Sequence, residues 1–153
     1  MKKFLPLVLT LVLADVSQAR IGETLDECKS RYGSLSGQLG PDEFTFNRDS
    51  VTIIVHLING RSVREDFVPE AGKVLSAAQV DALMRENAEG STWEILGETA
   101  SVINYSRADK RATAQRGKAN TSNTNAGNVK LTINNAELII KYTAAAARKV
   151  TAE

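Results

Sequence analysis

The chain contains one histidine and one cysteine, and these two residues limit the catalytic chemistry that its sequence offers. His56 lies in a β-type segment, and a two-residue turn at Asn59-Gly60 would place it opposite Val63, with Glu65 on a diagonal. A histidine beside a glutamate could act in acid–base catalysis. A half-buried histidine between apolar neighbours is more often a packing residue, so a small hydrolase using His56 is an alternative hypothesis.

Cys28 could be a nucleophile, a lipid anchor, half of a disulfide or a packing residue. A catalytic thiol requires a histidine partner and a cationic setting, and the sequence places neither beside Cys28. A single cysteine forms no internal disulfide, although an intermolecular disulfide stays open. A lipoprotein cysteine directly follows the apolar core of its leader, whereas Leu25-Asp26-Glu27 precedes this one. We therefore predict that Cys28 packs in the core and that the protein is not a lipoprotein.

The sequence gives no support for metal or cofactor chemistry. One histidine and one cysteine supply too few nitrogen and sulfur ligands for a zinc site. The sequence also contains no phosphate-binding glycine loop, dinucleotide fingerprint or nucleophile-elbow motif. We predict no metal and no cofactor, and we assign no catalytic residue.

A basic, polar segment is the candidate binding region. Residues 106–128 are polar and interrupted by glycines, which predicts a long polar loop. Its first part holds five basic residues against one acidic residue, Asp109. The candidate binding residues are Arg107, Lys110, Arg111, Arg116 and Lys118. Mobile cations can steer an acidic partner, and the simpler alternative is a solvated loop without a partner.

Capping patterns predict the helices that would position these residues. A T-x-x-E box at residues 24–27 and an S-x-x-Q box at residues 76–79 each satisfy free amides at a helix start. We expect the first helix to end at Gly33, the second to end at Gly90, and a third to begin at Asn135.

Strand signals occupy much of the remaining chain. Residues 43–67 are rich in β-branched residues and contain two turn signals, which predicts a three-strand antiparallel meander. Its central strand, Val51–Ile58, is apolar on both faces, so we expect cover on both sides. Shorter strands are predicted at residues 93–96, 101–105 and 129–133.

This order of elements predicts an α+β fold with short helices packed on a small antiparallel sheet. Each half of the chain would consist of a helix followed by a meander. We expect residues 20–148 to form a single α+β domain that includes the long polar loop, and residues 149–153 to form a flexible tail.

Residues 1–19 have the pattern of a secretory signal peptide. Two lysines precede an apolar run at residues 4–14, and small residues stand at Ser17 and Ala19, before the expected cleavage site. The apolar run is too short to cross a bilayer, which takes about 20 residues. We therefore expect cleavage after Ala19 and a periplasmic or secreted protein with no transmembrane segment in the mature chain.

The charge of the mature chain argues against nucleic acid as a partner. The whole chain has a formal net charge of +1, and Lys2, Lys3 and Asp15 of the signal peptide account for it. A neutral mature protein has no general electrostatic attraction to nucleic acid.

The opening IGETLDECKSRYG, the strands around Asn59-Gly60 and the segment LSAAQVDALMRENAEGSTWEIL resemble a family of small uncharacterised secreted bacterial proteins. Its members share an IGET-x-x-x-C-x-x-RYG opening and an L-S-x-x-x-h-x-x-L-h-x-x-N-x-x-G-x-x-W segment, where h is apolar. The resemblance covers about residues 20–105. It implies secretion and no assigned activity.

A weaker likeness is to the SmpA/OmlA outer-membrane-assembly lipoproteins and their β-lactamase-inhibitor-like fold. Gly22-Glu23-Thr24 at the helix start and Gly33 at its end match that pattern, although the lipoprotein cysteine is absent. This likeness implies a factor in outer-membrane assembly or structure.

These observations predict a secreted or periplasmic, non-catalytic interaction protein. Its partner would be an envelope or extracellular protein, or an anionic glycan or lipid head group. The alternatives are an outer-membrane assembly or structural factor and the small hydrolase that uses His56.

Overall fold

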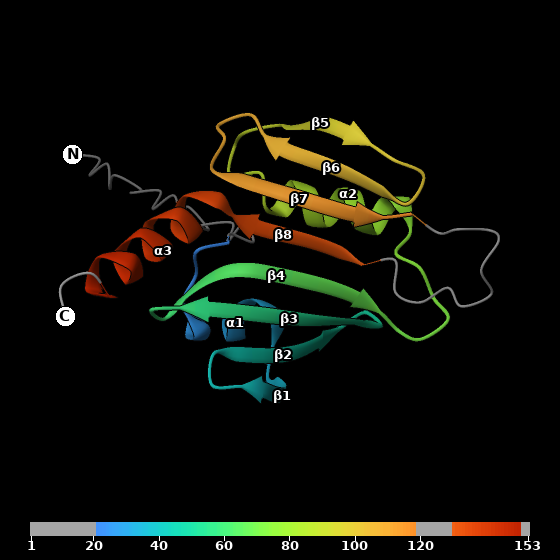
Figure 1. The fold of residues 1–153 in the computed structure, drawn as a ribbon. Helices are drawn as coiled ribbons and strands as arrows, with labels where there is room; N and C mark the ends of the chain where they lie inside the picture. Colours follow the sequence, from blue (N-terminus) through green and yellow to red (C-terminus); the bar gives the residue numbers. More distant parts are fainter. Residues whose placement is uncertain (1–20, 119–129, 151–153) are drawn as a thin grey trace, which may run out of the picture.

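Eight antiparallel strands form one sheet in the computed structural model, which describes residues 21–118 and 130–150. The strands are β1 (Leu35–Gly40), β2 (Glu43–Arg48), β3 (Val51–Ile58), β4 (Arg61–Pro69), β5 (Trp93–Glu98), β6 (Val102–Arg107), β7 (Ala112–Gly117) and β8 (Leu131–Asn135). The helices are α1 (Leu25–Tyr32), α2 (Ala77–Glu86) and α3 (Ala136–Val150). Figure 1 shows α1 and α2 behind the sheet, and α3 beside one end of it.

The sheet joins two meanders edge to edge. α1 precedes β1 to β4, and α2 precedes β5 to β8. The strand order is β1-β2-β3-β4-β8-β7-β6-β5, so the last strand of each meander lies at the centre of the sheet. Phe67 of β4 pairs with Leu131 of β8 there, and β1 and β5 are the two edges.

The predicted α+β fold with a small antiparallel sheet is wrong, because the sheet dominates the described chain. Two strands were not expected. β1 has the sequence LSGQLG, with no β-branched or aromatic residue, and β7 has the sequence ATAQRG, in which Thr113 is the single residue of this kind. β7 occupies part of the long polar loop predicted at residues 106–128, and it lies between β6 and β8. Pairing with these neighbours, rather than its own propensity, explains why it is a strand.

Both predicted capping boxes are present. Thr24 accepts a hydrogen bond from the amide of Glu27, whose carboxylate accepts one from the amide of Thr24. Ser76 and Gln79 make the equivalent pair of bonds at the start of α2. Gly33 ends α1 with φ of 91°, in the region that favours glycine.

α2 is shorter than predicted. It ends at Glu86 and is capped by Asn87, not by Gly90. The side-chain amide of Asn87 donates 3.1 Å to the carbonyl of Leu83, which also accepts the backbone amide of Asn87 at 3.2 Å.

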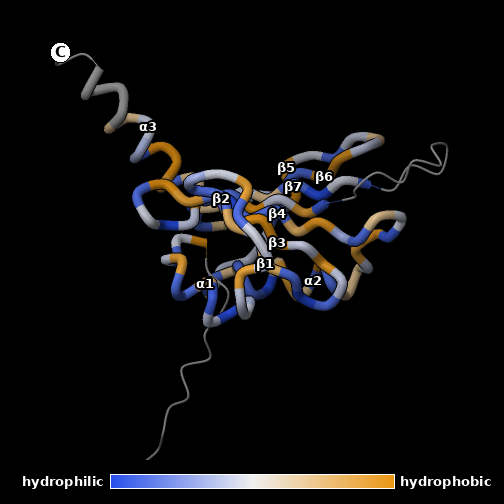
Figure 2. The backbone as a smooth tube through the Cα atoms, turned by 90° about the horizontal axis from the view of Figure 1, so that it is seen from below, coloured by the Kyte–Doolittle hydropathy of each residue, from blue (hydrophilic) through white to orange (hydrophobic). Residues whose placement is uncertain are grey.

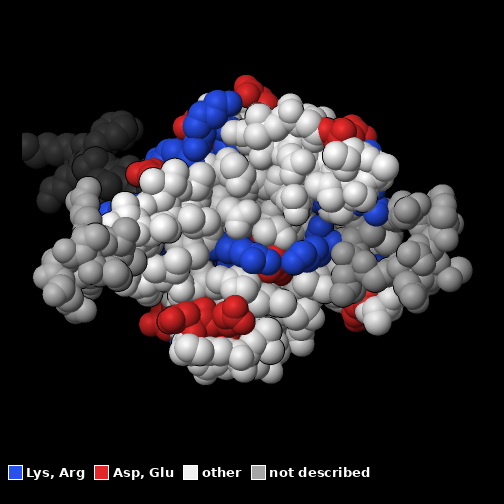
Figure 3. All heavy atoms as spheres, in the orientation of Figure 1, with Lys and Arg blue, Asp and Glu red and all other residues white. Residues whose placement is uncertain are grey.

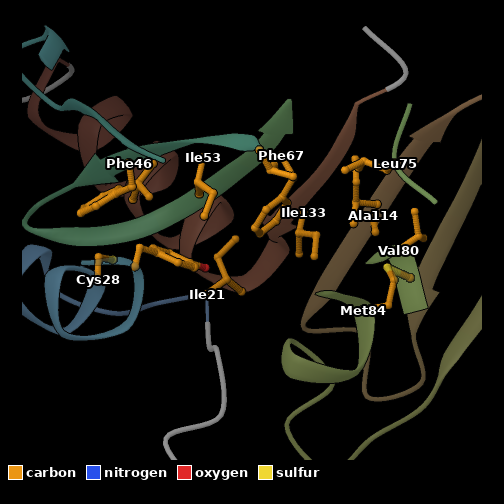
Figure 4. Packing of buried hydrophobic residues seen from close by; sticks show 14 of the residues in the cluster. Ile21, Cys28, Phe46, Ile53, Phe67, Leu75, Val80, Met84, Ala114 and Ile133 are labelled. Carbon is orange, nitrogen blue, oxygen red and sulfur yellow. The ribbon is translucent and has the colours of Figure 1, made fainter. Parts of the chain in front are cut away.

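One face of the sheet carries the core. Figure 2 shows α1 and α2 on the same side of the sheet, so the expectation that β3 is covered on both sides is wrong. In Figure 4, Cys28 and Phe46 lie near α1, Val80 and Met84 lie near α2, and Phe67 lies between the two groups. Cys28 is 0% exposed, which confirms that it is a core residue.

The predicted signal peptide and its cleavage site lie outside the described residues, as do the last three residues of the predicted tail. The first two tail residues, 149 and 150, belong to α3. Across residues 21–118 and 130–150, no helix is both long and apolar enough to cross a membrane.

Candidate functional site

The face of the sheet opposite α1 and α2 presents mainly polar side chains, together with Ile54, Val68 and Val102, and we call it the open face. Strand residues alternate between the two faces, and the buried residues of β3 point toward the helices. The pairing register then places the following residues on the open face: Glu43, Thr52, His56, Arg64, Asp66, Asn104, Thr113, Gln115, Thr132 and Asn134. In Figure 3, which looks onto this face, basic and acidic side chains meet near its centre.

Asp66 of β4 is the centre of this charged group. Its side chain is 5% exposed, and Arg64 approaches Oδ2 at 2.7 Å. The hydroxyl of Thr132 donates 2.5 Å to Oδ1, and the ammonium of Lys130 lies 3.5 Å from the same oxygen. The side chains of Arg64 and Lys130 are 40% and 42% exposed, so one buried carboxylate holds two cations that face solvent.

These contacts set the charge of Asp66. Burial alone would raise the pKa of the carboxyl, but the hydrogen bonds from Thr132 and Arg64 and the positive charges of Arg64 and Lys130 outweigh it. The pKa of Asp66 is therefore lower than its ordinary value, and the carboxylate stays ionised at neutral pH.

His56 is part of the same group, but not in the predicted way. Its Nδ1 lies 2.9 Å from Oε1 of Glu43, and its Nε2 lies 3.2 Å from Oδ2 of Asp66. The hypothesis of a dyad with Glu65 is wrong, because Glu65 lies on the core face and is fully buried. A bulge between His56 and Leu57 shifts the register, so His56 pairs with Arg64 and not with Val63.

A shallow cavity of about 320 Å³ lies beside the charged group, over β6, β7 and β8. Amide and hydroxyl side chains supply most of its lining, together with Leu96 of the edge strand. The amide of Gln115 donates 3.1 Å to Oδ1 of Asn104 across two of these strands. The open face therefore combines a charged centre with an uncharged, hydrogen-bonding depression.

Arg107 was predicted to bind a partner, but its side chain is 1% exposed and is part of the protein interior. Its Nε donates 2.9 Å to Asp109, and its Nη1 lies 3.1 Å from the carbonyl of Asn87 and 3.2 Å from Glu89. Burial alone would lower the pKa of Arg107, but Asp109 and Glu89 raise it above its ordinary value. This arginine joins the end of α2 to the β6–β7 hairpin.

The other predicted binding residues are not mobile loop cations either. Arg116 belongs to β7, and the other three residues make ion pairs on the surface. The pairs are Lys110 with Glu94 at 3.2 Å, Arg111 with Glu137 at 2.7 Å, and Lys118 with Glu98. The structure therefore does not bring the five predicted residues together on one surface.

Sequence analysis missed Arg64, Asp66 and Lys130. Arg64 and Asp66 lie two residues apart in a predicted strand, so their common face was detectable from alternation alone. Lys130 joins them only because β8 pairs with β4, a long-range contact that carries no local signal.

Comparisons with protein-family models, with curated proteins and with solved structures find no match to this chain. The resemblance over residues 20–105 therefore stays a hypothesis. Functional inference relies on the geometry of the open face and of the cavities.

Proposed function

We propose that this protein is a secreted or periplasmic, non-catalytic binding protein that holds a protein partner on the open face of its sheet. The observation that supports this proposal is the group in which buried Asp66 fixes two solvent-facing cations, Arg64 and Lys130. Cations that are already ordered lose little conformational freedom when a partner binds.

The size and polarity of the open face favour a protein over a small molecule. The face extends across an eight-stranded sheet, and neither α1 nor α2 covers it. Its exposed cations can pair with acidic side chains, while its amides and hydroxyls can bond to a partner's polar groups.

The position of His56 argues against the hydrolase alternative. Both ring nitrogens face carboxylates, at Glu43 and Asp66, so neither is free to take a proton from a substrate in this arrangement. His56 instead connects β2 to β4 across the open face.

Photo-crosslinking from single positions tests the proposed face. A photoreactive residue at Gln115, which is exposed on the open face, should give one discrete adduct with an extract of envelope and secreted proteins. The same probe at Asp81, exposed on α2, serves as the matched control and should give none. The adduct partner, identified by mass spectrometry and purified, should bind the unlabelled protein at fixed stoichiometry.

Charge changes complete the test. Arg64→Gln with Lys130→Gln should weaken binding of the purified partner by about tenfold or more and reduce its salt dependence. Adducts formed equally from Asp81, or binding unchanged by the double substitution, would contradict the proposed face. An adduct that proves to be a glycan or a lipid would replace the protein partner, and an outer-membrane assembly component would support the assembly alternative.

The location is tested separately by intact-mass measurement of the exported protein. We expect a chain that starts at Arg20 and carries no acyl group. A mass that still includes residues 1–19, or that includes acyl chains, would contradict the proposed secretion.

A further inference from the structure

A cavity of about 320 Å³ lies at the end of the sheet beside α3, away from the open face. The chain leading into α1, the start of β4, the region of the β6–β7 turn and the first turns of α3 border it. Figure 1 shows these segments together at one end of the molecule. Gly22 borders this cavity with φ of +110°, a backbone conformation that favours glycine.

Basic side chains from separate segments converge on this cavity. Its charged lining residues are Arg61, Arg107, Arg111, Lys141, Glu89 and Glu137. The two glutamates are already engaged, Glu89 with Arg107 at 3.2 Å and Glu137 with Arg111 at 2.7 Å. The lining therefore has four basic and two acidic residues. Just outside it, Glu27 lies 3.5 Å from Arg61 and Asp109 pairs with Arg107, so among the described residues Lys141 is the lining cation without an acidic partner.

The bonds of the lining residues limit how far the cations can move. Nη1 of Arg61 donates 3.3 Å to the carbonyl of Gly22 and lies 3.5 Å from Glu27. Lys141 lies 5.9 Å from the centre of the Tyr142 ring, within the range of a cation–π contact. Arg107 is fixed by its buried bonds.

We propose that this cavity binds a phosphate monoester group. Guanidinium groups match the geometry of phosphate oxygens, and an ammonium adds a compact positive charge. A phosphate monoester carries close to two negative charges at neutral pH, so it can replace the exposed Glu27 carboxylate beside Arg61 and pair with Lys141. The volume is at the small end of ligand sites, so the ligand is a head group or a small phosphorylated molecule and not a polymer.

This site does not depend on the proposed open-face function, because the cavity lining and the open face have no residue in common. Either can fail without the other. Of the predicted binding residues, Arg111 and the buried Arg107 border this cavity, and Arg61 and Lys141, which were not predicted, supply its accessible cations.

Titration with inorganic phosphate tests the site directly. Calorimetry on the full mature chain should show saturable binding at one site, and phosphate should raise the melting temperature. Arg61→Gln with Lys141→Gln should weaken binding by about tenfold to a hundredfold, because it removes two positively charged hydrogen-bond donors from the cavity. The matched control, Lys29→Gln with Lys73→Gln, removes the same charge from two exposed lysines, one on α1 and one in the loop before α2, and should leave binding unchanged.

Two further arms distinguish the source of the phosphate. Sedimentation with phosphatidylcholine vesicles that contain phosphatidate should carry down the protein, but not its cavity variant, if the ligand is a lipid head group. Phosphate binding without vesicle binding indicates a soluble phosphorylated molecule. The proposal is overturned if phosphate does not bind saturably, or if both double variants weaken binding equally. Circular dichroism confirms that each variant is folded before it is compared.

Discussion

The hydroxyl of Tyr32 donates a 2.9 Å hydrogen bond to Oε2 of Glu65, and this bond crosses from α1 to β4 inside the core. Glu65 is fully buried, and among the described residues its other oxygen has no hydrogen-bond partner. Arg31 of α1 lies near the pair and forms a buried ion pair with Glu23. The contact of α1 with the sheet therefore includes an ionisable group whose charge is costly to bury.

Glu65 should make stability depend on pH. Burial raises the pKa of Glu65 above its usual 4.5, and the bond from Tyr32 and the charge of Arg31 offset only part of this effect. The folded state then holds the proton of Glu65 more tightly than the unfolded state does. The contribution of this residue to stability is therefore complete below the ordinary pKa and is lost as pH rises through the folded pKa. Glu65→Gln keeps an acceptor for Tyr32 but cannot ionise. Between pH 4.5 and pH 8, the free energy of unfolding of this variant should therefore fall by about 1–3 kcal/mol less than that of the unchanged protein.

Urea denaturation at several pH values measures this difference. Asp81→Asn, on the exposed surface of α2, is the control and should follow the pH dependence of the unchanged protein. Identical pH profiles for Glu65→Gln and the unchanged protein would show that Glu65 does not carry the effect.

Cys28 should react slowly in the folded protein. Burial, with smaller contributions from the charges of Glu65 and Glu27, raises the pKa of its thiol to about 12. Little thiolate is then present at pH 8, and labelling should be on the order of a hundredfold slower than in urea, because it requires local opening. Cys28→Ser should lower the free energy of unfolding by about 1–3 kcal/mol through a buried hydroxyl. Rapid labelling of the native thiol would contradict the buried position.

Arg107 and Lys110 should differ sharply in their effect on stability. Arg107→Gln leaves Glu89 and Asp109 without their buried partner and should lower the free energy of unfolding by about 3–5 kcal/mol. Lys110→Gln removes an exposed ion pair with Glu94 and should change the free energy of unfolding by about 0–1 kcal/mol. Urea denaturation compares the two variants at one pH, and equal losses would contradict the structural role of Arg107.

Thr132 should hold Asp66 in its ionised form. Thr132→Val removes the 2.5 Å hydrogen bond to Oδ1, so the pKa of the carboxyl should rise toward its ordinary value. A lowered pKa contributes stability that is present above pH 3.8, the ordinary value, and is lost as pH falls through the folded value. The variant should therefore lose about 1–3 kcal/mol at pH 7 and less near pH 3. NMR titration of the Asp66 carboxyl carbon measures the change in pKa, and urea denaturation at pH 7 and pH 3 measures the loss of stability. An unchanged pKa would contradict this role of the hydrogen bond.

Local sequence signals predicted much of the local structure. Capping boxes located the starts of α1 and α2, and the Asn59-Gly60 pair located the turn between β3 and β4. Each signal acts within a few residues, where hydrogen bonding and backbone conformation are decided by the sequence itself.

The remaining features depend on contacts between distant segments. β7 has weak strand propensity, with Thr113 as its one β-branched residue, and the pairing of β4 with β8 joins residues far apart in the chain. The bulge at His56 shifted its β4 neighbours by one residue, which moved the expected acid on that strand from Glu65 to Asp66, while Glu43 faces His56 through the pairing of β2 with β3. The basic segment looked like one binding surface because sequence composition does not show which cations acidic side chains from other elements neutralise.

The central position of β4 has a consequence for how the chain folds. Residues 61–69 precede β8 in the chain, so a first meander that forms before β8 joins has β4 as a bare edge. Such edges pair readily with other chains and lead to aggregation, and charged residues on the strand oppose this. Three consecutive charged residues, Arg64, Glu65 and Asp66, lie on this edge, and all three pair with β8 residues in the finished sheet. The charges that organise the open face and tie α1 to the core therefore also protect the unfinished sheet from premature association.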